Sequence, residues 1–160
     1  MTDECFMRIA IRTAEKGIDN GDMPFGACLV DKNGTVVAIA RNRVKTRADV
    51  TAHAEVEAIR EAGRKLLLPD LKGLCLYATC EPCSMCFSAC LWSKLSRIVY
   101  AARIEDGERF GIISIPIPCS RMRQLSHSDV EIVGDVLRDE SVMLFATWSA
   151  ANDGALKTRS

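Results

Sequence analysis

Two short motifs, distant from each other along the chain, constrain its fold most, because their side chains must meet at one point. The first is His53-Ala54-Glu55, and the second is Pro82-Cys83-Ser84-Met85-Cys86. They supply one imidazole, two thiols and one carboxylate, which are groups that bind a metal ion or move protons. A structural zinc site usually takes four protein ligands, whereas three ligands leave one position open for water. The pattern therefore indicates a catalytic metal, with a carboxylate beside it for proton transfer.

The spacing within each motif indicates how the side chains converge. Cys83 and Cys86 are three positions apart, so they share one face of a helix whose first turn includes Pro82. His53 and Glu55 lie roughly 200° apart around a helix, so they meet only beyond its N-terminal end. A helix N-terminus also favours thiolates through its free N–H groups and its dipole. We therefore expect two helix N-termini to point at one His-Cys-Cys zinc site.

Such a site suits one kind of chemistry. Zinc lowers the pKa of a bound water toward ~7, and Glu55 can take a proton from that water and pass it to a substrate atom. The same carboxyl group can then protonate a leaving group. These proton movements suit the hydrolysis of an amine on a heteroaromatic ring, with release of ammonia.

Apolar periodicity and turn residues predict alternating helices and strands. Helices are expected over 4–16, 52–65, 82–92 and 139–150, with Gly17 as the stop of the first. Strands are expected over 27–30, 36–40, 74–78, 98–101 and 130–133. Residues 103–128 receive no assignment, because Pro116 and Pro118 interrupt an apolar run. The alternation favours an α/β fold, a three-layer α/β/α sandwich, in a single domain over 1–160.

The composition and charge indicate which kinds of partner and which cellular compartment to expect. Lys+Arg and Asp+Glu both number 21 among 160 residues, so no overall basic charge attracts a nucleic acid. No apolar run is long enough for a membrane span, and Met1-Thr2-Asp3-Glu4-Cys5 lacks the pattern of a signal peptide. We therefore expect no membrane partner, a cytoplasmic location and eight reduced cysteines.

Together the two motifs match H-x-E followed by P-C-x-x-C, a signature known from zinc deaminases. On these residues, and on Pro24-Phe25-Gly26-Ala27, Asn42 and Thr79-Cys80-Glu81, the chain resembles the cytidine deaminase superfamily over roughly residues 1–105. Within it, the chain is most similar to guanine deaminases and bacterial tRNA adenosine deaminases. The resemblance implies a mixed five-stranded sheet between helices, a zinc ion and a homodimer. It also implies a C-terminal segment, 129–160, able to close an active site.

The resemblance further implies a function and the residues that perform it. The function is hydrolytic deamination of a free nucleobase or related aminated heterocycle, with guanine first and cytosine or s-triazine bases next. The implied roles are zinc ligation by His53, Cys83 and Cys86, proton transfer by Glu55, ring contact by Asn42, pocket lining by Phe25 and Trp92, and contact of the Ala54 N–H with an exocyclic or carbonyl group.

The chain departs from these relatives at two places. Val50 stands where this branch usually has proline, and Phe110-Gly111-Ile112-Ile113-Ser114 occupies the region where guanine deaminases carry a Gly-Phe-Asp-Asp sequence. The second departure leaves the choice of base open. The roles of 105–128 and of Asp139 and Glu140 are open as well.

Two other functions stay open beside the leading one. The first is tRNA-specific adenosine deamination to inosine, for which a basic loop near the pocket provides a contact surface: Arg41, Arg43, Lys45 and Arg47. The second is a zinc-stabilised scaffold that has lost activity, which the intact Glu55 argues against. Among the other cysteines, Cys80 could pair with Cys83 and Cys90 could be a fourth ligand, but both are interpreted as buried packing residues.

Overall fold

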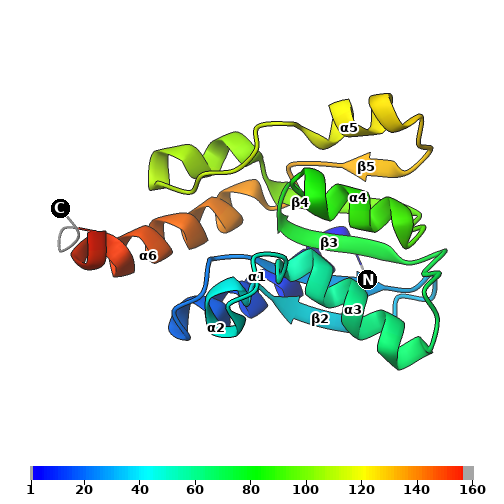
Figure 1. Ribbon diagram of the computed structural model, residues 1–160, viewed down its shortest axis with the longest axis horizontal. Helices are drawn as coiled ribbons and strands as arrows, with labels where there is room; N and C mark the ends of the chain where they lie inside the picture. The colour runs from blue at the N-terminus through cyan, green and yellow to red at the C-terminus, as the bar shows by residue number, and fades with distance from the viewer. Residues whose placement is uncertain (1, 157–160) are drawn as a thin grey trace.

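A five-stranded sheet organises the chain, and the computed structural model describes it over residues 2–156 (Figure 1). The strand order is β2-β1-β3-β4-β5. Strand β1 pairs antiparallel with β2 and β3, whereas β3, β4 and β5 run parallel, so the predicted mixed sheet is confirmed. The strands are β1 (Gly26–Val30), β2 (Val36–Arg41), β3 (Cys75–Cys80), β4 (Arg97–Ala102) and β5 (Glu131–Val133).

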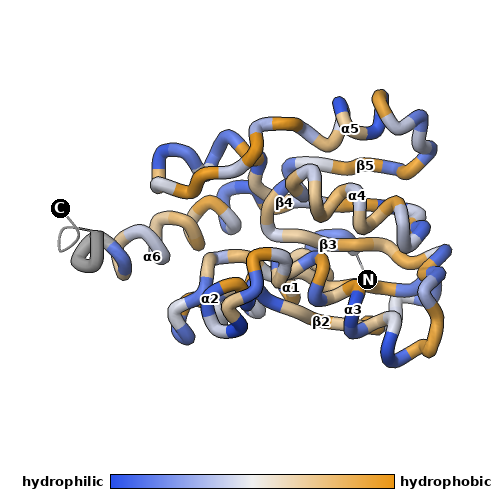
Figure 2. Tube along the Cα trace, viewed as in Figure 1, coloured by the Kyte–Doolittle hydropathy of each residue, from blue (hydrophilic) through white to orange (hydrophobic). Residues whose placement is uncertain are grey.

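Helices cover both faces of the sheet, which confirms the three-layer sandwich (Figure 1). One apolar core lies between the sheet and α3 (Ala54–Leu66), α4 (Ser84–Trp92) and α5 (Cys119–Ser126). The second core lies on the other face, beneath α1 (Asp3–Asp19) and α6 (Arg138–Leu156). Two short elements complete the fold: α2 (Val44–Arg47) and the 3-10 helix η1 (Ile104–Phe110). Every strand of the sheet is largely apolar, whereas hydrophilic residues gather on loops and outer helix faces (Figure 2).

One end of the sheet collects the segments that build the site. In the strand register, Gly26 at the start of β1 faces Arg41 at the end of β2. Ala27 pairs with Ala78 near the end of β3, so the residues just outside these strand ends lie at one edge. At the same edge, Thr79 accepts hydrogen bonds from the Gly26 N–H at 3.1 Å and the Ser141 hydroxyl at 2.5 Å. Helix α6 is thereby attached to the edge where the two motifs meet.

Glycine is required at position 26 because α1 lies directly on the backbone of β1. A Cβ atom added to Gly26 would overlap the Ala10 carbonyl oxygen and lie 2.7 Å from the Ala14 nitrogen. Backbone atoms of a packed helix cannot move aside cheaply, so a side chain at this position would displace α1.

Several predicted boundaries were wrong, for identifiable reasons. Helix α1 continues through Gly17 to Asp19, because Gly17 is buried against Met23 and Arg41 and the tertiary packing outweighs its low helix propensity. Pro82 lies outside α4, since Cys83 has extended backbone angles and is the N-cap residue. The stretch 103–128, left unassigned above, contains η1 and α5.

Two further expectations concern the ends of the chain and membranes. The predicted C-terminal segment 129–160 contains β5 and α6, and its residues 157–160 lie outside the described residues. Within residues 2–156, no helix combines the length and the apolar character that crossing a membrane requires.

Candidate metal centre and active site

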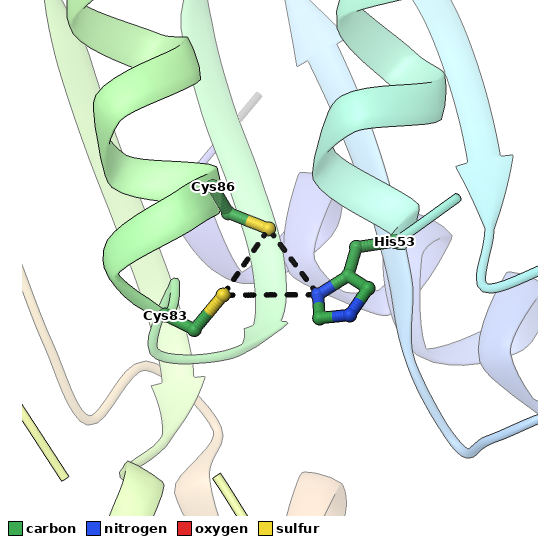
Figure 3. Close-up of side chains that lie close together, drawn as sticks. All are labelled: His53, Cys83 and Cys86. Atoms are coloured by element: carbon green, nitrogen blue, oxygen red, sulfur yellow. Dashed lines mark hydrogen bonds between the residues drawn. The ribbon is translucent and has the colours of Figure 1, made fainter. Parts of the chain in front are cut away.

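Three side chains from the two motifs converge at the N-terminal ends of α3 and α4 (Figure 3). His53 is the N-cap residue of α3, and Cys83 is the N-cap residue of α4. The His53 Nδ1 atom lies 3.7 Å from Cys83 Sγ and 3.4 Å from Cys86 Sγ, and the two sulfurs are 3.6 Å apart. In the described part of the chain, this is the one group of three or more such side chains close enough to hold a metal ion.

The donor set fits a zinc ion. A tetrahedral ion with Zn–S of ~2.3 Å and Zn–N of ~2.0 Å separates two sulfurs by about 3.8 Å, and a sulfur and a nitrogen by about 3.5 Å. The measured separations of 3.6 Å between sulfurs, and of 3.4 and 3.7 Å between sulfur and nitrogen, agree within the usual tolerance. Two thiolates and one imidazole form the ligand set of a zinc site that keeps a fourth position open.

The three groups shift one another's pKa values. The hydrogen bond with Cys86, together with His53, lowers the pKa of the Cys83 thiol to about 4. The hydrogen bond with Cys83 and burial raise the pKa of Cys86, so one of the two sulfurs holds a proton until a cation replaces it. Contact with the Cys83 sulfur also raises the pKa of His53. A metal ion would displace the proton of Cys86 and the extra proton of His53, so its binding depends on pH.

Glu55 lies beside this centre and takes no part in the three-ligand group. It occupies the first turn of α3, where its side chain is buried yet lines the cavity that also contacts His53 and Cys83. Burial raises the pKa of the Glu55 carboxyl above its ordinary value. A raised pKa makes the protonated form easier to reach, so the carboxyl group can donate as well as accept a proton, as a proton carrier requires.

A cavity of about 170 Å³ opens in front of the metal centre. Phe25 and Asn42 are among the residues that line it. Asn42 is buried, and its Oδ1 accepts a hydrogen bond from the Val44 N–H at 3.1 Å. That bond leaves the Asn42 amide N–H groups to donate to an acceptor atom in the cavity. Ala54 is buried as the first residue of α3, where a backbone N–H has no partner within its own helix.

The family model of the cytidine and deoxycytidylate deaminase zinc-binding region matches residues 1–102, which include both motifs. The chain belongs to this deaminase family. Its members are zinc-dependent hydrolases that deaminate nucleobases or nucleosides. The metal centre and Glu55 lie within the matched residues, whereas α5, β5 and α6 lie beyond them.

Individual relatives of this deaminase differ in what they act on. The tRNA-specific adenosine deaminase of Aquifex aeolicus is 38% identical over 72% of this chain and 74% of its own length. The guanine deaminase of Bacillus subtilis is 41% identical over 69% of this chain and 71% of its own length. A solved structure of the protein NE0047 in complex with 2,6-diaminopurine aligns with a TM-score of 0.88 and 30% identity, over 94% of this chain and 83% of that one. Family membership therefore fixes the reaction class and leaves the substrate unresolved.

The structure corrects the prediction that Trp92 lines the pocket. Trp92 is the last of the nine residues of α4, so it lies about 12 Å along the helix from the end that carries the metal ligands. Its side chain is 86% exposed and borders a groove with Ile59 and Leu68 instead of the cavity. The prediction was wrong for this chain because helix length separates the two ends of α4, although both belong to one helix.

Much of the cavity wall was missed in the sequence. From α6, Phe145 reaches the cavity and packs edge-on against Phe25, with ring centroids 5.8 Å apart. Phe145 carries no spacing signal, because it lies far from both motifs along the chain. Residues 110–114, which differ from the guanine deaminase sequence, supply Ile112, Ile113 and Ser114 to the cavity wall. That difference was the one sequence feature that pointed to this part of the wall. The lining residues missed above are Met23, Val44, Cys80, Glu81, Ile104, Gly107, Ile112, Ile113, Ser114 and Phe145.

Proposed function

We propose that this deaminase hydrolyses the exocyclic amine of a free purine base, with guanine first, and that cytosine and s-triazine bases follow. The observation that carries the proposal is the size of the cavity in front of Glu55 and the metal centre. Its volume of about 170 Å³ lies below the ~300–1,000 Å³ of pockets for drug-sized ligands, so it suits one small ring system without a sugar. The likeness to a protein solved with 2,6-diaminopurine supports the same substrate class.

In the proposed reaction, water adds to the ring carbon that carries the amine, and ammonia leaves. Zinc held by His53, Cys83 and Cys86 would supply a Lewis acid at this point and make water easier to deprotonate. Glu55 removes a proton from the attacking water and transfers it to the ring nitrogen. It then takes the second proton from the hydroxyl group on the ring carbon and delivers it to the amine, which leaves as ammonia while the carbonyl forms. Asn42 donates to an acceptor on the ring, and Phe25 and Phe145 provide an apolar face that excludes bulk water.

Action on tRNA is the second candidate, since a tRNA-specific adenosine deaminase is among the relatives. The basic loop that would favour it is partly neutralised inside the protein. Arg41 pairs with Asp22, and Arg47 pairs with Glu57 at 2.5 Å. Of the four basic residues, Arg43 and Lys45 are the two that form no ion pair within residues 2–156. Two unpaired cations provide little phosphate-binding charge, which favours the free base.

A substrate panel tests the proposal. Ammonia release would be measured with guanine, 2,6-diaminopurine, adenine, cytosine, ammeline, their nucleosides where they exist, and a tRNA anticodon stem-loop. We expect a purine base to give the highest kcat/KM, and guanosine at least ~100-fold less, because the added sugar exceeds the cavity. Ammonia from the stem-loop alone would contradict the free-base proposal and support the tRNA candidate.

We also propose that the enzyme pairs with a second copy of itself through the face that carries Trp92. Leu67 and Trp92 are both 86% exposed there, at the C-terminal ends of α3 and α4. Large apolar side chains that are exposed close together are typical of a surface that binds another protein. Light scattering should give the mass of a dimer for the wild-type chain and that of a monomer for Trp92→Glu. An unchanged mass would contradict the assignment of this face.

A cytoplasmic location is part of the same proposal. All eight cysteines have free thiols, and several are buried. Free thiols in this number suit a reducing compartment, where glutathione keeps them reduced. Full zinc loading after purification under reducing conditions, with loss of zinc on oxidation, is the expected result by metal analysis.

A further inference from the structure

Glu81 is a buried carboxylate that the proposed reaction does not use. It lies between Cys80, the last residue of β3, and Pro82, directly before the metal ligand Cys83. Its side chain is 7% exposed. A buried carboxylate is costly unless hydrogen bonds compensate for the lost water, so its contacts show what holds it in place.

Both carboxylate oxygens of Glu81 accept backbone hydrogen bonds from other elements. Oε1 accepts from the Cys119 N–H at 2.7 Å, and Oε2 accepts from the Ile104 N–H at 3.5 Å. Cys119 is the first residue of α5, and Ile104 is the first residue of η1. Acidic side chains are favoured at helix N-termini, and the 2.7 Å distance is at the short end of the range for an N–H···O hydrogen bond.

These two contacts enclose one stretch of chain, residues 104–119, which we call the outer wall. Its two ends are attached to the same carboxylate. Five of its residues line the substrate cavity: Ile104, Gly107, Ile112, Ile113 and Ser114. Glu81 also lines this cavity and the neighbouring one of about 360 Å³, so it lies between the two.

In the middle of the outer wall, Ile112 is anchored: it is buried in the core beneath α1 and α6, and its N–H donates to the Gly107 carbonyl oxygen at 3.1 Å. Residues 111–118 form neither helix nor strand, and the segment is strongly hydrophobic (Figure 2). Burial does not hold it throughout, because Ile113 is 95% exposed and Ile115 is 56% exposed. After Ile112, the position of residues 113–118 therefore depends on the attachment at Cys119.

A second bond strengthens the attachment at Cys119. The buried Cys119 thiol donates to the Pro82 carbonyl oxygen at 3.3 Å, and burial raises the pKa of that thiol, so it keeps its proton. Glu81 and Pro82, the two residues before Cys83, thus both contact Cys119. Two bonds therefore join the loop that carries a metal ligand to the outer wall at Cys119.

We propose that Glu81 is a positioning residue that sets the distance between the metal centre and the outer wall, and thereby the fit of the substrate base. This inference rests on the proposed function for its kinetic consequence, while its structural consequence can be measured without any substrate. Glu81 touches no reacting atom in this scheme. Its loss should loosen the outer wall and weaken substrate binding, while the metal and the proton transfer persist.

The first experiment compares Glu81→Gln with Glu108→Gln. Gln keeps the length of the side chain but loses the charge, and its amide cannot accept two N–H groups with both of its polar atoms. We expect zinc content to stay at the wild-type level, KM for guanine to rise ~10-fold, and kcat to change less than twofold. Glu108 is an exposed residue of η1 that lines only the neighbouring cavity, so Glu108→Gln should match the wild type.

Hydrogen exchange measures the same effect without catalysis. Amides of the zinc-loaded protein over 104–119 should exchange ~10-fold faster in Glu81→Gln than in the wild type, and those of α3 should be unchanged. If no base is deaminated, the proposed function fails, while the exchange rates still decide the role of Glu81. Unchanged exchange over 104–119, loss of zinc, or a fall in kcat at constant KM would each overturn the positioning role.

A second pair of variants tests the Cys119 N–H, the donor of the hydrogen bond to Glu81. Cys119→Pro deletes the N–H that Glu81 accepts, at a first helical position where proline is well tolerated and where Pro118 already has extended angles. Cys119→Ala keeps this N–H and removes only the thiol. We expect Cys119→Pro to reproduce the faster exchange and higher KM of Glu81→Gln, and Cys119→Ala to show less than a third of either change. Equal effects of the two would overturn the assignment to the Glu81 carboxylate.

Discussion

The two sides of the substrate cavity are built in opposite ways. On the metal side, His53, Glu55 and Cys83 occupy the first turns or caps of two helices that pack on the sheet. On the other side, residues 111–118 have no regular structure, and Ile113 is almost fully exposed. The metal side is held by a buried core, whereas the outer wall is held by the buried Ile112, the Asp106–Arg138 contact and the Glu81 carboxylate at both of its ends.

This difference separates two tasks. Groups that move protons or hold a metal need positions fixed within a fraction of an ångström, and regular elements in a packed core provide that. Groups that choose among similar rings can lie on a segment whose sequence varies without disturbing the core. Changes on the metal side should therefore affect every substrate alike, and changes on the outer wall should affect substrates unequally.

The largest effect is expected from Cys83→Ala. Removing one of the three ligands should reduce zinc from about one per chain to nearly none, because two protein ligands hold the ion poorly, and activity on every base should disappear. Metal analysis and ammonia release measure the two effects. The matched control is Cys90→Ala, a buried cysteine of the same helix outside the three-ligand group, which should retain its zinc. Zinc loss in the control would make Cys90 a ligand.

Glu55→Gln should have the next largest effect. Without a titratable group, kcat should fall ~10²–10⁴-fold for each substrate, while zinc content stays the same and KM changes little. Steady-state kinetics with metal analysis tests this. Full activity of this variant would remove Glu55 from the reaction, and loss of zinc would assign it to the metal site.

Phe145→Leu tests the cavity wall that α6 supplies. Phe145 is fully buried and contacts the Phe25 and Phe110 rings, so the smaller side chain should cost about 1–3 kcal/mol in the free energy of unfolding. KM should rise by different factors for guanine and cytosine, with kcat less affected. Met143→Ala is the control, because Met143 is 69% exposed on the same helix. Equal changes in KM for both bases would contradict the separation of tasks.

The smallest effect is expected from Asp106→Asn, which weakens the contact between η1 and α6. The Arg138 guanidinium, 2.7 Å from Asp106, lowers the pKa of that carboxyl. A lowered folded pKa stabilises the protein above the unfolded value of ~3.9, and this stability is lost as the pH falls through the folded pKa. The variant should therefore be about 1 kcal/mol less stable than the wild type at pH 7, and this difference should shrink as the pH falls below the unfolded value. Urea unfolding at neutral and at acidic pH measures this difference in the free energy of unfolding between the two proteins. A difference that does not change with pH would show that the ion pair contributes nothing.

The sequence was sufficient to predict the metal side. The three-residue spacing of Cys83 and Cys86 and the helix starts near both motifs required convergence, and the structure brings His53, Cys83 and Cys86 together. The fold class followed from the alternation of strands and helices, because each apolar strand needs cover on both faces. Both the spacing within a motif and the alternation of strands and helices can be read from residues close together in the sequence.

The outer wall could not be predicted in the same way. Ile112 of the outer wall and Phe145 of α6 both line the cavity, and neither has a fixed spacing from a motif. Gly17 was misread as a helix stop because its burial against Arg41 is a long-range contact. Glu81 stood within a recognised motif, yet its two bonds reach Ile104 and Cys119, which no local pattern indicates.

The exposure of Ile113 at the mouth of the cavity has a thermodynamic consequence. An isoleucine in water carries a shell of solvent whose heat capacity is high, and covering the side chain releases that solvent. A base seated against Ile113 should therefore bind with a negative change in heat capacity, so the binding enthalpy becomes more favourable on warming. Ile113→Ser should reduce that temperature dependence in calorimetry with a non-reacting base analogue. A side chain with no chemical role would thus set how the enzyme's affinity responds to temperature.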